Sequence, residues 1–252
     1  MIKKTILIMP FITVAIVSMV YSCRTSRVGV QNSGIDTIYT AQHEKGYPIA
    51  FHFEKGSKHN FPLMAVWITD TNDNYLQTLY VAESVAKGVF KHGETSTGKW
   101  LPGPIRRPAA LPVWAHSRGI QEEDGLFVPT VNTPVADAYT GATPLNDFVL
   151  YSNIQDTSVN IFYVYFEVNQ TWDWNDYWTN NKYPDDEDYK TSCQPSLVYR
   201  AKADKENASE VLELKLIGHG HYSGKDGKIY PDISTFTTAL DITKRAYVIL
   251  GN

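Results

Sequence analysis

The sequence predicts an all-β protein, an antiparallel β-sandwich with long loops and one or two short helices. Aromatic residues make up 13% of the chain and β-branched residues are plentiful, whereas stretches with the 3.6-residue period of a helix are scarce. About ten short strand-like segments follow one another with turn residues between them. This pattern is typical of two antiparallel sheets packed face to face.

The predicted strands alternate apolar and polar residues, or form short apolar runs between turns. They cover residues 35–40, 47–53, 62–69, 75–82, 148–151, 160–168, 196–201, 211–217 and 245–250. Residues 83–91 and 233–242 favour short helices. Residues 92–128 contain several prolines and tryptophans and predict a long loop of the functional or covering kind. Residues 70–74 start like a calcium loop, but Tyr75 replaces its glycine and Val81 its bidentate glutamate, so a hairpin turn is expected.

The N-terminus has the pattern of a secretory signal peptide. Lys3 and Lys4 precede an apolar run that is shorter than the ~20 residues needed to span a bilayer, and Cys23 follows a small residue. The similarity to bacterial lipoproteins implies cleavage before Cys23 and lipidation of its thiol, which would anchor the protein to a membrane. We expect a signal peptide at 1–22, a tether at 23–34 and one β-sandwich domain at 35–252, in an extracytoplasmic, periplasm-facing location.

Charge and cysteine content argue against a nucleic-acid partner and against a disulfide. The formal net charge is -4 and no basic stripe is present, which argues against nucleic acid as a partner. Once Cys23 carries lipid, Cys193 is the remaining thiol, so no intramolecular disulfide is expected. Cys193 is predicted to be a buried small residue.

Residues 137–143 read D-A-Y-T-G-A-T. They resemble the acceptor motif D-x-x-[ST]-G-A-[ST], onto which a flavin transferase esterifies FMN in extracytoplasmic redox proteins. The resemblance implies a threonyl phosphoester on Thr143, with Asp137 orienting the metal or the acceptor. A threonine hydroxyl is a weak nucleophile that an outside base or metal must activate. The other positions that we assign to this candidate site are Tyr139, Thr140, Gly141 and Ala142.

The small residues of the motif suit close approach by another protein. Pro134 and Pro144 flank the motif. The residue before a proline favours extended or turn backbone, so the motif is predicted to be an exposed loop. The alternative is a small-residue turn between two strands, with no cofactor.

Several segments together resemble one family, the predicted periplasmic proteins of domain-of-unknown-function family 2271. The segments are residues 65–70, 77–81, 111–114, 137–143, 166–178, 194–199 and 218–227, spread over roughly residues 47–250. The resemblance implies an immunoglobulin-like sandwich and a redox setting, since some members occur beside membrane electron-transfer components and flavin transferases.

Two further groups of residues are candidates for binding. Trp172 and Trp174 lie in an acidic aromatic loop and could stack on a flavin or a sugar, as could Trp100, Trp114 and Tyr139; alternatively, the aromatic loop covers one end of the sandwich. His219 and His221 alternate and would offer two imidazoles to zinc or copper if they lay on a strand. No third ligand is evident near the histidines beyond Asp226 or Asp232, and hydrogen-bonding histidines in a loop are the alternative.

The sequence therefore supports two hypotheses. In the first, the protein is a lipid-anchored electron carrier with covalent FMN on Thr143, loaded by a flavin transferase and reduced by a membrane reductase, rather than an enzyme with its own substrate. In the second, it is a non-catalytic binding or scaffold module in the periplasm, and the motif is a structural turn.

Overall fold

The computed structural model describes residues 34–41, 43–94 and 96–251. The chain divides into two compact units, Met1–Asn32 and Ser33–Asn252, and all described residues belong to the second. The predicted signal peptide, Cys23 and most of the predicted tether lie outside the described residues. The second unit is mostly β, as the composition predicts.

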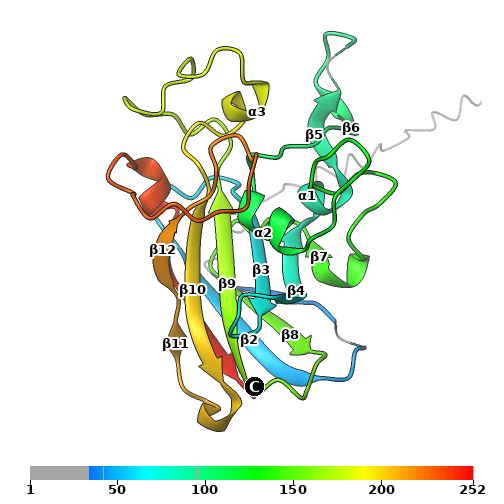
Figure 1. The fold of residues 1–252 in the computed structure, drawn as a ribbon, viewed down its shortest axis with the longest axis vertical. Helices are drawn as coiled ribbons and strands as arrows, with labels where there is room; N and C mark the ends of the chain where they lie inside the picture. The colour runs from blue at the N-terminus through cyan, green and yellow to red at the C-terminus, as the bar shows by residue number, and fades with distance from the viewer. Residues whose placement is uncertain (1–33, 42, 95, 252) are drawn as a thin grey trace, which may run out of the picture. The chain divides into compact units, whose positions relative to one another are not determined.

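Two sheets form the body of this unit (Figure 1). Sheet A has the strand order β1-β8-β2-β13-β11, and sheet B has the order β12-β10-β9-β3-β4-β7. The strands of sheet A are β1 (Asp36–Tyr39), β2 (Tyr47–Lys55), β8 (Phe148–Ile154), β11 (Leu212–Glu213) and β13 (Thr243–Leu250). Those of sheet B are β3 (Leu63–Thr69), β4 (Tyr75–Ala82), β7 (Thr140–Gly141), β9 (Ile161–Asn169), β10 (Leu197–Asp204) and β12 (Lys215–His219).

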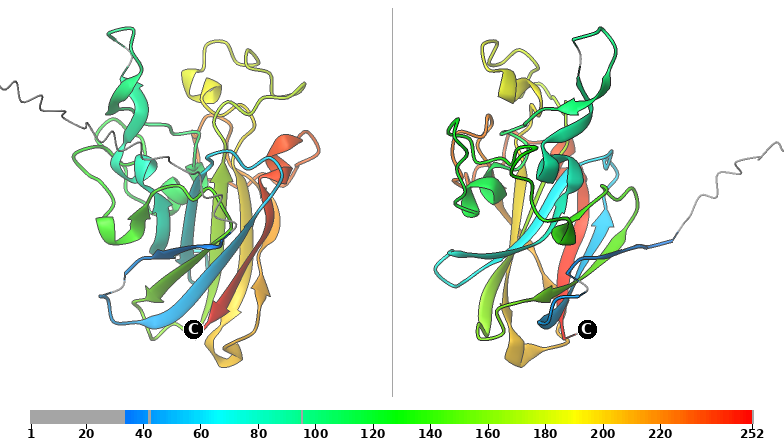
Figure 2. Two further views of the ribbon diagram at one scale, coloured as in Figure 1. Left: turned by 180° about the vertical axis from the view of Figure 1, so that it is seen from behind. Right: turned by 90° about the vertical axis from the view of Figure 1, so that its right-hand side faces the viewer.

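Both sheets are mixed rather than wholly antiparallel. Strand β1 pairs with β8 in parallel, and β7 pairs with β4 in parallel, whereas the other pairs within sheets A and B are antiparallel. The prediction of two packed sheets is confirmed, but the antiparallel pairing fails at one edge of each sheet, where β1 and β7 pair in parallel. The right-hand view of Figure 2 shows the two sheets as separate layers.

Strand β3 explains why sheet B is the middle layer. All seven of its residues are buried, and successive side chains of a strand point to opposite faces. Met64, Val66 and Ile68 join the core between the sheets, whereas Ala65 and Trp67 join a second core on the outer face of sheet B. Burying both faces of a strand requires a third layer of structure, which the loops and helices provide.

The third layer contains α1 (Glu83–Lys87), α2 (Pro112–Ser117) and the two-stranded sheet of β5 (Val89–Glu94) and β6 (Leu101–Pro104). Helix α1 ends at Lys87 and is capped by Gly88, whose left-handed φ of 60° suits glycine. In Figure 1, these elements and α3 (Glu187–Lys190) lie towards the upper end of the sheets. The remaining helical turns are η1 (Asp137–Tyr139), η2 (Lys205–Asn207) and η3 (Thr238–Asp241).

Four predicted elements outside the motif differ from the structure. The predicted helix at 233–242 is reduced to the turn η3 (Thr238–Asp241). The predicted helix at 83–91 stops at Lys87, and β5 follows. The predicted loop at 92–128 contains part of β5, all of β6 and helix α2. The predicted strand at 211–217 is split into β11 and β12, because Leu214 carries the chain from sheet A to sheet B.

Candidate functional site

The motif at residues 137–143 lies at an edge of sheet B. Asp137, Ala138 and Tyr139 form the turn η1, and Thr140 and Gly141 form β7, which pairs with Val81 and Ala82 of β4. The motif was predicted to be an exposed loop. It is instead a short helical turn followed by a short strand at the edge of sheet B. Pro134 before the motif is exposed and Pro144 after it is buried, whereas the next residue, Leu145, is exposed again.

Tyr80, on the neighbouring strand β4, holds the backbone of the motif in place. Its hydroxyl donates to the carbonyl oxygens of Gly141 (3.3 Å) and Ala142 (3.1 Å). Burial, which is the larger cause, and the nearby Glu83 carboxylate raise the pKa of Tyr80, so the hydroxyl stays protonated and able to donate. A Cβ on Gly141 would lie 3.0 Å from Cε2 of the Tyr80 ring, so glycine allows the strand to pack closely on this ring.

Thr143, the predicted acceptor, is half-buried, between the exposed Ala142 and the buried Pro144. None of the hydrogen bonds among the described residues involves the Thr143 hydroxyl. Two residues later, the Lys55 ammonium donates to the Leu145 carbonyl (3.2 Å) and to Oδ1 of Asn146 (3.3 Å). Hydrogen bonds from Lys55 thus hold the segment after Thr143 against β2. The Thr143 hydroxyl makes no hydrogen bond to the described residues.

Asp137 is the one charged residue of the motif, and 81% of its side chain is accessible. Lys87 lies 3.1 Å from one of its carboxylate oxygens and 2.8 Å from Glu83. The Thr140 hydroxyl donates to the Asp137 carbonyl (3.4 Å). These contacts hold η1 against α1 and leave the other carboxylate oxygen of Asp137 facing solvent.

Tyr139, a predicted flavin contact, is half-buried rather than exposed. Its hydroxyl accepts a hydrogen bond from the Gln155 amide. Burial, more than the nearby Glu44 carboxylate, raises the pKa of Tyr139. The ring belongs to the support of the motif, and its hydroxyl already has a partner.

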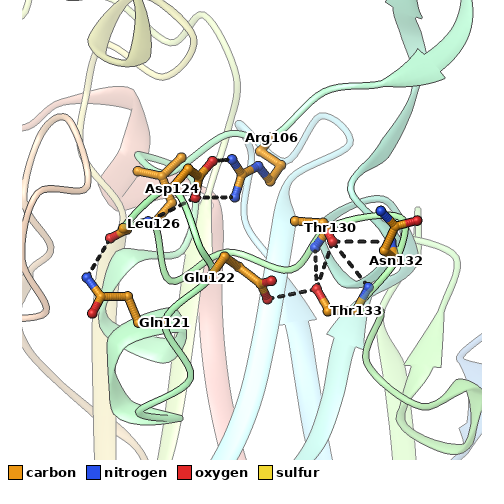
Figure 3. Close-up of polar contacts among 9 residues, drawn as sticks. Arg106, Gln121, Glu122, Asp124, Leu126, Thr130, Asn132 and Thr133 are labelled. Carbon is orange, nitrogen blue, oxygen red and sulfur yellow. Dashed lines mark hydrogen bonds and ion pairs between the residues drawn. The ribbon is translucent and has the colours of Figure 1, made fainter.

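The chain before the motif is held by a small polar network (Figure 3). Arg106, which follows β6, forms an ion pair with Asp124. The Thr133 hydroxyl donates to Glu122 (2.7 Å) and lies 2.7 Å from the Thr130 hydroxyl. These contacts fold the loop of residues 118–133 onto itself and lead the chain to Pro134 and the motif.

The tryptophans predicted as flavin contacts have different surroundings. Trp172 and Trp174 are exposed, at 53% and 59%, on the loop after β9. Sheet B places β3 and β4 between β9 and β7, so this loop and the motif belong to different strands. Trp172 instead meets Trp100 edge to face, with ring centroids 6.4 Å apart. Trp114 is fully buried and donates to the Thr78 hydroxyl (2.9 Å), so its predicted contact with a flavin is wrong.

The aromatic loop also covers one end of the sandwich. Trp178 is buried and packs against Tyr189, His219, Tyr222 and Phe236. Within this loop, Trp178 is therefore a core residue, whereas Trp172 and Trp174 lie at the surface.

The two histidines line a small cavity of about 110 Å³ with Tyr222 and Tyr230. His219 donates from Nδ1 to the Gly220 carbonyl (2.7 Å), and His221 accepts from the Ser223 backbone N–H (3.1 Å). Burial lowers the pKa of both imidazoles. Within the part of the chain that the structure describes, no group of three or more histidine, cysteine, aspartate or glutamate side chains is arranged to hold a metal ion.

Cys193 is fully buried, as predicted, and burial raises the pKa of its thiol to about 11. Among the described residues no helix is both long and apolar enough to cross a bilayer. The predicted lipidation site, Cys23, lies outside the described residues.

One buried acid has no counterpart among the sequence-based candidates. Glu167 lies on the outer face of β9 and is fully buried beneath α2. It accepts hydrogen bonds from the backbone N–H groups of Val113 (3.2 Å) and Trp114 (2.7 Å) and from the Ser196 hydroxyl (2.6 Å). Burial outweighs these bonds and raises the pKa of Glu167 to about 7. Glu167 thus joins the first turn of α2 to sheet B.

The fold and the motif define a β-rich protein of two packed sheets with a surface-edge threonine. Comparison with family models, with curated proteins and with solved structures gives no match for this chain in any of the three.

Proposed function

We propose that the protein is a lipid-anchored extracytoplasmic electron carrier with FMN esterified to Thr143. The observation that supports this proposal best is the state of the Thr143 side chain. It is half-buried on an edge segment, and its hydroxyl has no hydrogen-bonding partner among the described residues. A threonine that served only as a structural turn would ordinarily bond its hydroxyl to nearby backbone.

The surroundings of Thr143 fit a covalently attached phosphate. Ala142 before it is small and exposed, and Tyr80 holds the Gly141 and Ala142 carbonyls, so the acceptor sits on fixed backbone. Asp137 keeps one carboxylate oxygen toward solvent, where it can meet a metal ion of the transferase. Strand β7 is at the edge of its sheet, which leaves room for a second protein to approach.

The modification is a phosphoryl transfer from FAD. The Thr143 oxygen attacks the phosphorus of the FMN half, the bond to AMP breaks, and the hydroxyl proton passes to a base of the flavin transferase. The attached flavin supplies electron-transfer chemistry that the side chains of this protein lack. Covalent attachment suits an extracytoplasmic carrier, because a dissociated cofactor would be lost, and a membrane reductase is the proposed electron donor.

The same proposal includes the resemblance to domain-of-unknown-function family 2271 and its immunoglobulin-like topology. Two packed sheets with short helices support it at the level of architecture. The parallel edge pairs β1–β8 and β4–β7 are additions to an antiparallel sandwich of that kind.

The test is co-expression of the full chain with a flavin transferase, followed by intact mass measurement and fluorescence of the separated protein. We expect a mass increase of one FMN less one water, lost in Thr143→Ala. Thr157→Ala is the control, since Thr157 is an exposed threonine outside the motif, and it should keep the adduct. An unmodified wild-type chain beside a flavinylated positive-control substrate would refute the proposal.

A binding module is the second candidate, and the exposed tryptophans favour it. Trp100, Trp172 and Trp174 are all more than half exposed, and the first two touch each other. Large exposed aromatic side chains mark surfaces that bind partners or glycans. Binding of the wild-type chain to an array of purified glycans, lost in Trp172→Ala, would support this candidate, and an array without signal would remove its glycan form.

A further inference from the structure

A second cavity lies on the outer face of sheet B, away from the motif. Its volume is about 350 Å³, and it is bounded by β3, β9, helix α2 and the segment around Gly227 and Ile229. The strand order places β4 between β3 and the motif strand β7. Gly227 allows the walls to approach each other, because a Cβ there would lie 2.4 Å from Cβ of His116. We call this cavity the α2 cleft.

The floor of the α2 cleft contains an unused hydrogen-bond donor. Trp67 is 1% exposed and its ring stacks on Tyr165 with centroids 5.0 Å apart. The indole N–H groups of Trp114 and Trp178 donate to the hydroxyls of Thr78 and Thr235. The indole N–H of Trp67 has no such partner among the described residues.

A nearly buried donor without a partner is unfavourable, and a ligand that accepts from it relieves that cost. The Trp67 side chain lines the cleft, and its nitrogen is not among the fully enclosed side-chain atoms that lack partners. A molecule in the cleft can therefore accept this hydrogen bond.

Two hydrogen-bond acceptors line the same cleft. Nδ1 of His116 lies 2.9 Å from the Pro112 carbonyl, which can only accept, so Nδ1 carries a proton and neutral His116 keeps its lone pair on Nε2. The His116 ring stacks on Phe127 with centroids 4.1 Å apart, which fixes its orientation. Nε2 has no hydrogen-bond partner among the described residues.

Asp73 supplies the second acceptor. One of its carboxylate oxygens accepts from the Tyr165 hydroxyl (2.6 Å) and lies 3.8 Å from Arg200. The other oxygen has no contact of this kind within the described part of the chain. Arg200, which is not part of the cleft lining, partly balances the charge of Asp73 from the neighbouring strand β10.

We propose that the α2 cleft binds a small neutral polyhydroxylated molecule of monosaccharide size. Adjacent hydroxyl groups both donate and accept, so one such molecule can accept from Trp67 and donate to His116 and Asp73. The volume falls at the lower end of the range of about 300–1,000 Å³ for small-molecule pockets. The Asp73 carboxylate repels anionic ligands, and its ion pair with Arg200 weakens its attraction for cationic ones.

The experiment follows the tryptophan indole N–H resonances of the ¹⁵N-labelled full chain. The probes are D-glucose, D-xylose and myo-inositol, with sodium acetate and ethylammonium chloride as charged comparisons. The chain has six tryptophans, and the resonance of Trp67 is identified by its loss in Trp67→Phe. We expect a saturable shift of the Trp67 resonance with at least one neutral probe, in the millimolar range, and unchanged Trp114 and Trp178 resonances.

Two variants test the acceptor role of His116. His116→Phe keeps an aromatic ring against Phe127 but removes Nε2, and we expect about tenfold weaker binding, which corresponds to one hydrogen bond. His92→Phe is the matched control, because His92 lies on β5 outside the cleft, and it should bind like the wild type. Retained wild-type spectra outside the cleft show that each variant is folded.

The proposal is overturned if no neutral probe moves the Trp67 resonance up to its solubility limit, because the cleft then holds only solvent. It is also overturned if acetate or ethylammonium alone moves this resonance, or if His116→Phe binds the neutral probe as tightly as the wild type. None of these outcomes depends on flavin at Thr143.

Discussion

Replacing Glu167 by glutamine removes a fully buried acid from beneath α2 while nearly keeping its shape. The wild-type carboxyl group is fully buried against the first turn of the helix, and burial raises its pKa from an ordinary 4.5 to about 7. Between those two values the folded protein holds a proton that the unfolded chain has released. Stability therefore falls as the pH rises through this window.

The size of the effect follows from the shift. One pKa unit corresponds to about 1.4 kcal/mol, so a shift from 4.5 to about 7 corresponds to roughly 3 kcal/mol of unfolding free energy. The stabilising contribution of the protonated group is fully present below pH 4.5 and is lost as the pH rises through about 7. Glutamine does not titrate, so the Glu167→Gln variant should lack this loss.

The assay is urea unfolding, followed by tryptophan fluorescence, of the wild type and Glu167→Gln from pH 4.5 to 8. We expect the stability of the variant relative to the wild type to rise by roughly 3 kcal/mol across this range. Glu210→Gln, at an exposed position, is the matched control and should follow the wild type at every pH. A wild-type-to-Glu167→Gln difference that stays constant with pH would show that the Glu167 carboxyl is already ionised at pH 5, and the reasoning from burial would be wrong.

Two other predictions concern the motif and the buried thiol. Tyr80→Phe removes the hydroxyl that donates to the Gly141 and Ala142 carbonyls, so amide exchange across residues 140–143 should speed up and the unfolding free energy should fall by about 1 kcal/mol; unchanged exchange there would contradict the anchoring role of Tyr80. Cys193 is fully buried with a pKa raised to about 11, so peptide mapping should find it unlabelled by iodoacetamide at pH 8 until the chain is unfolded, and labelling of the native protein would count against the buried placement.

Strands that depend on local pattern were predictable. The predicted ranges 62–69, 75–82 and 160–168 match β3, β4 and β9 to within a residue at each end. In each case, apolar side chains lie on both sides of the strand. A short apolar run without the 3.6-residue period of a helix is typical of a buried strand.

Features that depend on distant partners were not predictable. The alternation of residues 211–217 continues through Leu214, so nothing local shows that the chain changes sheets there. The parallel pairs β1–β8 and β4–β7 join segments far apart in sequence. Helix α2 did have a local signal, since Pro112 occupies its first position, but the surrounding prolines favoured a loop.

The sites divide in the same way. The motif was visible because its residues are contiguous, whereas the acid beneath α2 and the cleft beside it depend on side chains brought together by the fold. Glu167 is the single acid in the otherwise apolar and aromatic run of residues 161–168, and nothing local shows what covers its side of β9. Only the placement of α2 over that face makes it a buried acid, with donors from positions 113, 114 and 196.

Within the motif, the positions differ in how far structure alone accounts for them. Asp137 pairs with Lys87, Thr140 bonds back to the Asp137 carbonyl, and Gly141 allows contact with the Tyr80 ring. Each of these would be useful in a protein that never carried a cofactor, so they favour neither hypothesis. The Thr143 hydroxyl has no comparable task among the described residues, and a valine or alanine would fill the same half-buried space. For this reason Thr143, rather than the glycine or the aspartate, is the position at which substitution separates a flavin carrier from a structural turn.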